Sequence, residues 1–423
     1  MIPKFIEIVG REVRHGNREL LRLVLRDFLG RRQERTRDLS VHLDAAIAWI
    51  CRAQDATGSG GVARSYCVAW HPYFRTYGWL PAYPETTGYI IPTMFDHAAA
   101  TGRADIRRRA IAMADWEISV QMPSGAVLGG IIGMPPTPAV FNTGQVIFGW
   151  VRAARETGDE RYVAAAERAG VFLVEHMDSD GVWRRGLSRH AKAGPQTYNT
   201  RTAWSLLELG QMTGDRRFLA AGRRNVESAL TRQLPNGWFS GNCLDNDDAP
   251  LTHTIAYATR GILESGVLLG DPRYLAAARA TADALLACQR PDGSLAGRYD
   301  EHWRPVVRWS CLTGNAQVAI IWLRLASLIK EPAYLRAAER SLDFLASLQV
   351  LDSQNEGIRG GVAGAYPIYG DYGRLEYLNW AAKFFAEAIM LKQGCASETV
   401  NADAARRVPM GGTFDQSVVA ALT

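Results

Sequence analysis

The sequence predicts an all-α protein, an (α/α)6 barrel in which six inner and six outer helices form a closed toroid. Three observations predict it. A turn that leads into an amphipathic helix occurs five times, a glycine-containing turn closes each such helix, and a second, apolar type of helix occurs six times. The repeat has a period of roughly 55 to 60 residues, which is typical of stacked helix pairs.

The first of these repeated segments contains a turn and the start of an outer helix. It reads TGRADIRRRAIAMA, TGDERYVAAAERAG, TGDRRFLAAGRRNV, LGDPRYLAAARATA and IKEPAYLRAAERSL. Tyr162, Phe218, Tyr274 and Tyr334 share one register beside small alanines, as expected for helices with one buried face. A further outer helix is predicted at the N-terminal side, from Leu39 to Gln54.

Each outer helix ends in a recurring turn. The copies are RAQDATGSGG, SVQMPSGAV, EHMDSDGVW, TRQLPNGWF, ACQRPDGSL and SLQVLDSQNEG. Glycine adopts the positive φ that other side chains resist, so the chain is expected to reverse direction there.

The inner helices follow these turns and a variable loop. They are predicted to begin near Glu85, Pro138, Tyr198, Thr252, Leu312 and Gly373. They are apolar on nearly all sides, which a helix buried on both sides requires. Six such pairs favour a closed barrel over an open solenoid.

The toroid is assigned to residues 39–392, a basic helical extension to 1–38 and a tail to 393–423. The net charge of +5 is too small over 423 residues to indicate a nucleic-acid partner. The apolar residues from Leu20 to Leu29 alternate with arginines. This pattern favours a helix packed across the outside of the cup, and it also suits peripheral contact with an acidic membrane surface.

The six cysteines contain no CxxC pair, and the N-terminus lacks a long apolar stretch, so we expect a cytoplasmic protein with reduced thiols. The oligomeric state is left open. No P-loop, Rossmann, HExxH or EF-hand pattern occurs, so neither a cofactor nor a metal site is predicted, although a calcium ion at the acidic Asp245–Asp248 loop stays an open alternative.

The helix-pair pattern and the Gln-x-x-x-Gly turns resemble a broad class of helical toroids. That class includes six-hairpin glycosidases, sugar epimerases, toroidal polysaccharide lyases and terpene cyclases. More narrowly, YPETTGYIIPT, YNTRTAW and PLTHTIAYATRGILE resemble stretches of bacterial proteins associated with exopolysaccharide gene clusters. The resemblance implies a saccharide substrate.

The candidate site is the rim at which the N-termini of all six inner helices meet. An aromatic loop, WHPYFRTYGWLPAYP, leads into it and suits stacking on sugar rings. The residues predicted to bind substrate are Trp79, Tyr83, Asn142, Gln145, Tyr198, Asn199, Arg201, Asn315 and Tyr372. Their amides, hydroxyls and guanidinium suit a ligand with many hydroxyl groups.

Three chemistries fit the catalytic candidates. Glycoside hydrolysis, which we favour slightly, needs two carboxyl groups, here drawn from Glu85, Asp371 and Glu376 on the first and sixth inner helices. A uronate lyase or C5-epimerase needs a cation for the sugar carboxylate and acid–base groups, for which His253 and Tyr257 stand one helical turn apart.

The third chemistry is terpene cyclisation, because Asp245, Asp247 and Asp248 form an Asp-x-Asp-Asp pattern before an inner helix. In cyclases of this kind the central acid, held protonated by neighbouring carboxylates, protonates an alkene. A non-catalytic glycan-binding protein of a polysaccharide biosynthesis complex is a fourth alternative, because a fold alone does not guarantee catalysis.

Overall fold

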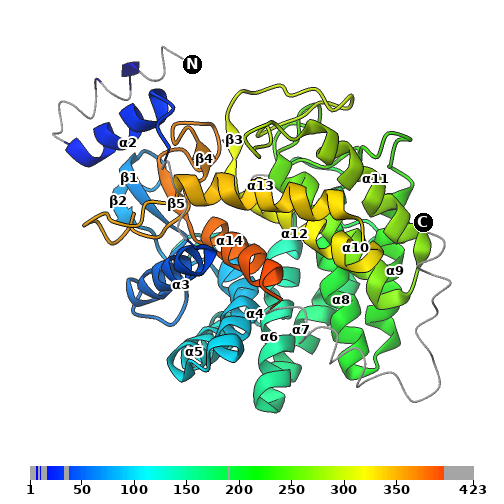
Figure 1. The fold of residues 1–423 in the computed structure, drawn as a ribbon. Coiled ribbons are helices and arrows are strands. Elements are labelled where there is room, and N and C mark those ends of the chain that lie inside the picture. Colours follow the sequence, from blue (N-terminus) through cyan, green and yellow to red (C-terminus); the bar gives the residue numbers. More distant parts are fainter. Residues whose placement is uncertain (1–5, 8–9, 11–16, 33–37, 189–190, 395–423) are drawn as a thin grey trace.

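The computed structural model describes residues 6–7, 10, 17–32, 38–188 and 191–394. Over these ranges the chain forms the predicted (α/α)6 toroid (Figure 1). The inner helices are α4 (Pro84–Thr101), α6 (Val140–Thr157), α8 (Thr200–Thr213), α10 (Thr252–Leu269), α12 (Leu312–Ile329) and α14 (Asn379–Lys392). The outer helices are α3 (Leu39–Asp55), α5 (Ala104–Val120), α7 (Glu160–His176), α9 (Arg216–Leu230), α11 (Pro272–Cys288) and α13 (Pro332–Leu348).

The ring is closed. Each inner helix packs against the next, and the last one, α14, packs against the first, α4. The N-terminal helix α3 packs against α14 and thereby completes the outer set of six. The prediction of a closed barrel over an open solenoid is therefore confirmed.

The glutamines of the recurring turns join consecutive outer helices. The Gln121 amide donates to the carbonyl of Gly125 in its own turn and to that of Ala165 on the next outer helix. Gln54, Gln233, Gln289 and Gln349 do the same. The Gln349 amide reaches His42 on α3, so the same device that builds the repeat also closes the outer ring.

Two inner helices begin later than predicted. The third starts at Thr200, after a short 3-10 helix, η1 (Thr197–Asn199). The sixth starts at Asn379 and not near Gly373, because the residues just before it form a strand.

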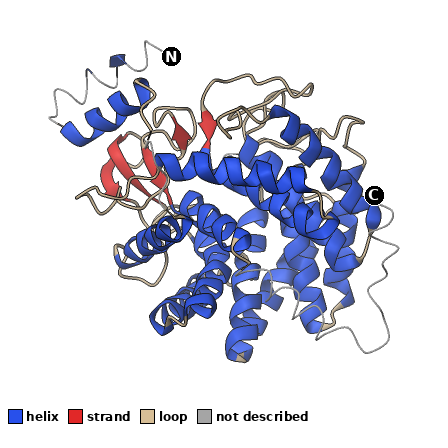
Figure 2. Ribbon diagram, in the orientation of Figure 1, coloured by secondary structure: helices blue, strands red, loops and turns tan. Residues whose placement is uncertain are grey.

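Two small antiparallel sheets lie near one end of the molecule (Figure 2). The first has the order β2-β1-β5, and the second pairs β3 with β4. The strands are β1 (Ser65–His71), β2 (Thr76–Trp79), β3 (Ser310–Cys311), β4 (Ala365–Tyr366) and β5 (Glu376–Leu378). These strands were not predicted, since β1 pairs with β5 across about three hundred residues of sequence and local patterns carry no sign of such pairing.

The basic extension contributes α2 (Arg18–Phe28), which lies beside this sheet (Figure 1). The Asn17 amide donates to the carbonyl of Val68 at 2.8 Å, and the Asp27 carboxylate accepts from the backbone N–H of Ile368 at 2.8 Å. Leu20 and Val24 are buried beneath the helix. The tail predicted for 393–423 lies outside the described residues from 395 onward.

Among the described helices, only α12 is long and apolar enough to cross a membrane by length and composition. Its place in the ring explains its apolarity, since 78% of it is buried between α10 and α14 and the outer layer.

Candidate active site

Most of the predicted polar and aromatic residues at the N-terminal ends of the inner helices form one contiguous cluster. We call it the mouth cluster and define it as Tyr83, Glu85, Tyr89, Asn142, Gln145, Tyr198, Arg201, His253, Tyr257, Tyr372 and Trp380. The members come from five of the six inner helices, η1 and the loop before β5. Closure of the ring brings these distant segments together.

Glu85 is the carboxyl group of this cluster. It lies in the first turn of α4, is 9% exposed, and accepts a hydrogen bond from the Tyr83 hydroxyl. Burial raises the pKa of Glu85 to about 7, against the opposing effects of this hydrogen bond and of the Arg201 and Arg64 charges. Desolvation therefore outweighs the hydrogen bond and the attraction of the guanidinium groups, and about half of the molecules carry a proton on Glu85 at neutral pH.

Arg201 is a buried cation that forms no ion pair with a carboxylate within the described ranges. It is 4% exposed, and its Nε donates to Oε1 of Gln145 at 2.7 Å. Its two terminal nitrogens have no hydrogen-bond partner among the described residues. The guanidinium carbon lies 5.2 to 5.8 Å from the ring centroids of Tyr89, Phe148, Trp204, Tyr257 and Phe384. Aromatic faces stabilise a cation but leave its planar N–H fork available for an anion such as a sugar carboxylate.

His253 and Tyr257 stack on one face of α10, as their spacing predicts, with ring centroids 4.3 Å apart. Burial lowers the pKa of His253 to about 4, and its Nδ1 lies 2.8 Å from Oε1 of Gln317. The imidazole is therefore neutral at physiological pH. The Tyr257 hydroxyl lies 3.4 Å from that of Tyr89, and burial raises the pKa of both phenols, so they are protonated as well.

Several predicted amides line the same mouth. Asn142 lies 3.5 Å from the Tyr83 hydroxyl and donates to the carbonyl of Leu128. Among the buried polar atoms that have no partner in the described residues are Oδ1 of Asn142 and Nε2 of Gln145, both in the mouth cluster, and Oδ1 of Asn199, which directly follows Tyr198 of that cluster. Because buried polar atoms are nearly always satisfied, this set indicates a place built for a polar ligand or water.

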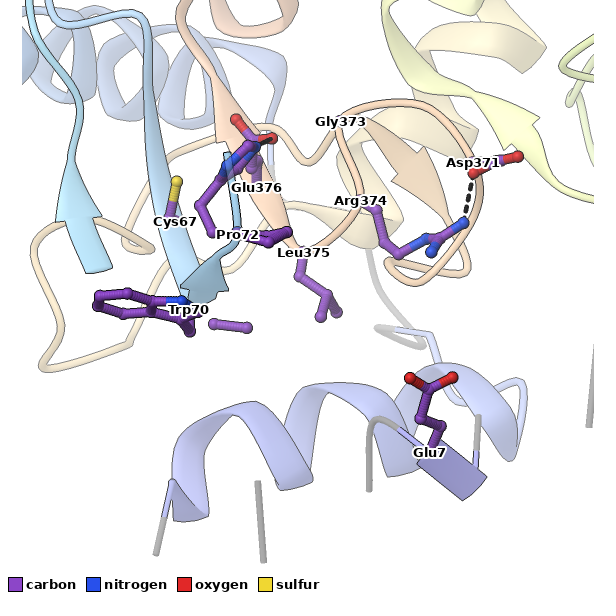
Figure 3. A pocket seen from close by; sticks show the side chains of 11 residues that line it. Glu7, Cys67, Trp70, Pro72, Asp371, Gly373, Arg374, Leu375 and Glu376 are labelled. Atoms are coloured by element: carbon purple, nitrogen blue, oxygen red, sulfur yellow. Dashed lines mark hydrogen bonds and ion pairs between the residues drawn. The ribbon is translucent and has the colours of Figure 1, made fainter. Parts of the chain in front are cut away.

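Glu376 and Asp371 do not lie on an inner helix, contrary to prediction. Glu376 stands in β5, where its carboxylate is fully used: it accepts from Arg64 and Ser65 at 2.5 Å each and lies 3.3 Å from Nε2 of His71. The Arg64 charge outweighs burial and lowers the pKa of Glu376 to about 2. Asp371 lies in the preceding loop, its side chain 65% exposed and ion-paired with Arg374 (Figure 3). The pair of carboxyl groups expected on the first and sixth helices is therefore not formed.

Trp79 and Asn315 have structural contacts instead of an open face. The Trp79 ring packs 5.0 Å from Trp49 and 5.1 Å from Tyr66. The fully buried Asn315 accepts from the backbone N–H of Leu295 and donates to the carbonyl of Cys311, so its amide is already engaged. Both residues hold the loops that frame the mouth.

The Asp-x-Asp-Asp alternative is not supported by its surroundings. Asp245, Asp247 and Asp248 lie in an exposed loop before α10. Asp245 is ion-paired with Arg298 at 2.7 Å, and hydrogen bonds from Arg298 and Cys243 outweigh desolvation and lower the pKa of Asp245. A cyclase acid must instead be buried and protonated. Among the described residues, no three His, Cys, Asp or Glu side chains converge as metal ligands would.

Sequence reasoning missed buried ion pairs that lie one to three turns farther along the inner helices. Lys383 pairs with Glu387 on α14, and Arg324 donates to both oxygens of Glu264 at 2.9 Å. Burial lowers the pKa of Lys383 to about 8. The i, i+4 placement of Lys383 and Glu387 in an otherwise apolar helix is a signal that would have identified them. Arg64, which follows a turn, carries no such signal.

Solved structures of helical toroids resemble the chain. A heparin-specific unsaturated glucuronyl hydrolase shares 17% identity at a TM-score of 0.66, over 84% of this chain and 96% of its own. An unsaturated glucuronyl hydrolase from a Bacillus species shares 16% identity at 0.66, over 84% and 97%. A sugar epimerase from a ruminal bacterium shares 13% identity at 0.66, over 83% and 96%.

No family model matches the chain, and no curated protein does. At these identities the likeness establishes the (α/α)6 toroid fold, which agrees with the sequence prediction.

Proposed function

We propose that the protein is a glycoside hydrolase that acts on an acidic exopolysaccharide or an oligosaccharide derived from one. Glu85 donates a proton to the glycosidic oxygen, which leaves as the alcohol. A water molecule attacks the anomeric carbon, and its proton passes to the Glu85 carboxylate left by the first transfer, so that one carboxyl group serves as acid and then as base. Arg201 binds the carboxylate of the uronyl residue. The observation that carries the proposal is the coexistence, in one mouth, of a carboxyl group with a pKa of about 7 and a buried guanidinium that has no carboxylate partner.

The assignment follows from what cleavage requires. Protonating the leaving oxygen near neutral pH needs an acid whose pKa is raised into that range, as Glu85 has. Fixing an acidic sugar needs an uncompensated cation, as Arg201 supplies. The neutral His253 and the phenols of Tyr257 and Tyr372 are placed to orient hydroxyl groups. Solved toroids that are named as unsaturated glucuronyl hydrolases support the same substrate class.

The test is incubation of the purified protein with uronate-containing oligosaccharides, with both saturated and unsaturated non-reducing ends. New reducing ends from the wild type, together with their loss in Glu85→Gln, support the hydrolase. Glycan binding without turnover supports the non-catalytic alternative. Consumption of a polyprenyl substrate, with loss on Asp247→Asn, would favour the cyclase.

A uronate C5-epimerase or lyase is the second candidate, since the mouth contains one protonated carboxyl group and not two. With Arg201 polarising the sugar carboxylate, Glu85, His253 and Tyr257 would exchange the C5 proton. A solved sugar epimerase of the same fold gives this reading its support. Deuterium uptake at C5 without cleavage identifies the epimerase, and a gain of unsaturated-uronate absorbance identifies the lyase.

We further propose a cytoplasmic location and peripheral contact of α2 with an acidic membrane. The five described cysteines, Cys51, Cys67, Cys243, Cys288 and Cys311, are free thiols, as a reducing compartment allows. Leu25 on α2 and Leu29, its C-cap residue, are about half exposed, on the same face as the exposed Arg18 and Arg22. Sedimentation with anionic vesicles, but not with neutral ones, and its loss in Arg18→Glu/Arg22→Glu, tests the contact.

A further inference from the structure

A pocket of about 490 Å³ lies beside the β1–β2 hairpin and outside the mouth cluster (Figure 3). Trp70, His71 and Pro72 line it from the hairpin, Asp371, Arg374 and Glu376 from the loop and strand before α14, and Glu7 from the N-terminal segment. The volume falls within the range of small-ligand sites.

One wall of the pocket is an exposed aromatic ring. Trp70 is 39% exposed, and its ring is supported from behind by Tyr77, at 5.2 Å between centroids. A partly exposed indole that is held in place by a second ring is costly to leave in water. It suits stacking on the apolar face of a sugar ring.

The opposite wall is polar and mainly acidic. Asp371 and Arg374 form an ion pair at the edge of the pocket, and Nε of Arg374 is buried without a partner among the described residues. Glu376 adds a second carboxylate, which Arg64, Ser65 and His71 already engage, and Glu7 adds a third. Carboxylates accept hydrogen bonds from hydroxyl groups but repel a sugar that carries a carboxylate or sulfate. The wall therefore suits a neutral hexose.

A single side chain links this pocket to the mouth cluster. Arg64 donates to Glu376 at 2.5 Å, and its guanidinium carbon lies 5.1 Å from the Trp380 ring centroid. Trp380 in turn packs on Tyr83, the hydrogen-bond donor to Glu85. Arg64 and Trp380 thus form a wall that the pocket and the mouth cluster share.

We infer that this pocket is a second saccharide subsite, in which Trp70 stacks on a neutral hexose unit of the substrate and Asp371 and Arg374 bind its hydroxyl groups. The inference rests on the proposed function, because the hexose belongs to the same glycan as the uronyl residue at Glu85. It assigns a specificity to the chain: neutral units next to the uronate are accepted, and charged units are rejected.

The experiment measures binding by calorimetry in the full-length Glu85→Gln protein, so that turnover plays no part. The probes are a uronate linked to two neutral hexoses and a uronate linked to one hexose and one sulfated hexose. Trp70→Ala is expected to weaken binding of the neutral trisaccharide roughly three- to tenfold, and Trp70→Phe to retain most of it. Leu335→Ala removes an equally exposed apolar side chain (41%) on α13 and is expected to change nothing.

Two outcomes overturn the inference: equal affinity of the Trp70→Ala variant and its parent for the neutral probe, or tighter binding of the sulfated probe by the parent. Failure of the proposed function looks different. In that case the wild type cleaves neither probe, whereas the dependence of binding on Trp70 can still be measured.

Discussion

The Tyr83 hydroxyl donates a hydrogen bond to Oε2 of Glu85, the carboxyl group two residues farther along the chain. The bond stabilises the ionised form of Glu85 and so lowers its pKa, against the larger effect of burial. Tyr83, which does not itself react, therefore lowers the pKa of the proposed acid.

Activity is expected to fall as the pH rises through about 7, because the proton on Glu85 is then lost. In Tyr83→Phe the pKa of Glu85 rises further, so the alkaline limb of the profile of kcat/KM against pH moves to higher pH. A limb that stays in place, or moves to lower pH, would show that Glu85 is not the titrating acid.

Replacing Arg201 with Met is expected to reduce kcat/KM on a uronate-containing substrate by about 10- to 100-fold, as the loss of a charge-assisted hydrogen bond of about 1.5 to 3 kcal/mol implies. The free energy of unfolding should change little, because the side chain is buried without a carboxylate partner and the methionine keeps its contacts with the aromatic rings. Activity assays combined with chemical denaturation separate the two effects. A comparable loss on a neutral glycoside would contradict the assigned role.

Glu117→Leu is expected to stabilise the protein by about 1 to 3 kcal/mol. Glu117 is fully buried on α5, and neither carboxyl oxygen has a partner in the part of the chain that the structure describes. Its repeat counterparts on α7, α11 and α13 are Leu173, Leu285 and Leu345. A urea unfolding curve measures the gain in the free energy of unfolding. A loss of stability would contradict the prediction, because it would mean that the carboxyl group has a hydrogen-bond partner.

The same residue predicts a pH dependence of stability. Burial raises the pKa of Glu117 well above 4.5, so the folded state keeps a proton that the unfolded state releases. Its contribution to the free energy of unfolding must therefore fall as the pH rises above about 4.5. Denaturation at pH 5 and pH 8 is expected to show a larger difference for the wild type than for Glu117→Gln, which cannot ionise.

Gly360→Ala is expected to destabilise the protein by more than 3 kcal/mol. Gly360 has φ +79°, and a Cβ there would lie 2.3 Å from the carbonyl oxygen of Ala45, so strain and a clash with backbone add together. Gly58 is the matched control. Its φ is +62° with open space around it, and its alanine variant should cost only about 1 to 2 kcal/mol. Equal melting temperatures of the two variants would contradict this.

Sequence reasoning succeeded where structure is determined by local, repeated chemistry. The Gln-x-x-x-Gly turns make the same two hydrogen bonds in five of the six repeats, and in the remaining one Met177 replaces the glutamine while Asn225 donates to the turn carbonyl of Gly181. Residues in the first turns of the inner helices, such as Glu85 and His253, lie in one cluster, as predicted. The direction of the inner helices is enough to predict this, because it places all their N-termini at the same rim of the toroid.

It failed where the chain pairs over long distances. Glu376 looked like the start of a helix because apolar residues follow it directly. Its conformation is decided by pairing with Cys67, and its charge by Arg64, 312 positions earlier. Neither partner is visible in a local pattern, so a paired carboxylate was mistaken for a free one.

The contacts of Gln349 with His42, 307 positions away, have a consequence for folding during synthesis. During synthesis, α3 leaves the ribosome before the other helices of the ring, and its partners α13 and α14 leave after them. Until then the nascent chain is an open spiral, and the apolar faces at its two ends are exposed to water. Such faces are prone to associate with other chains. We therefore expect the contacts of α3 with α14 and Gln349 to form last. A chain in which they do not form would be prone to aggregation.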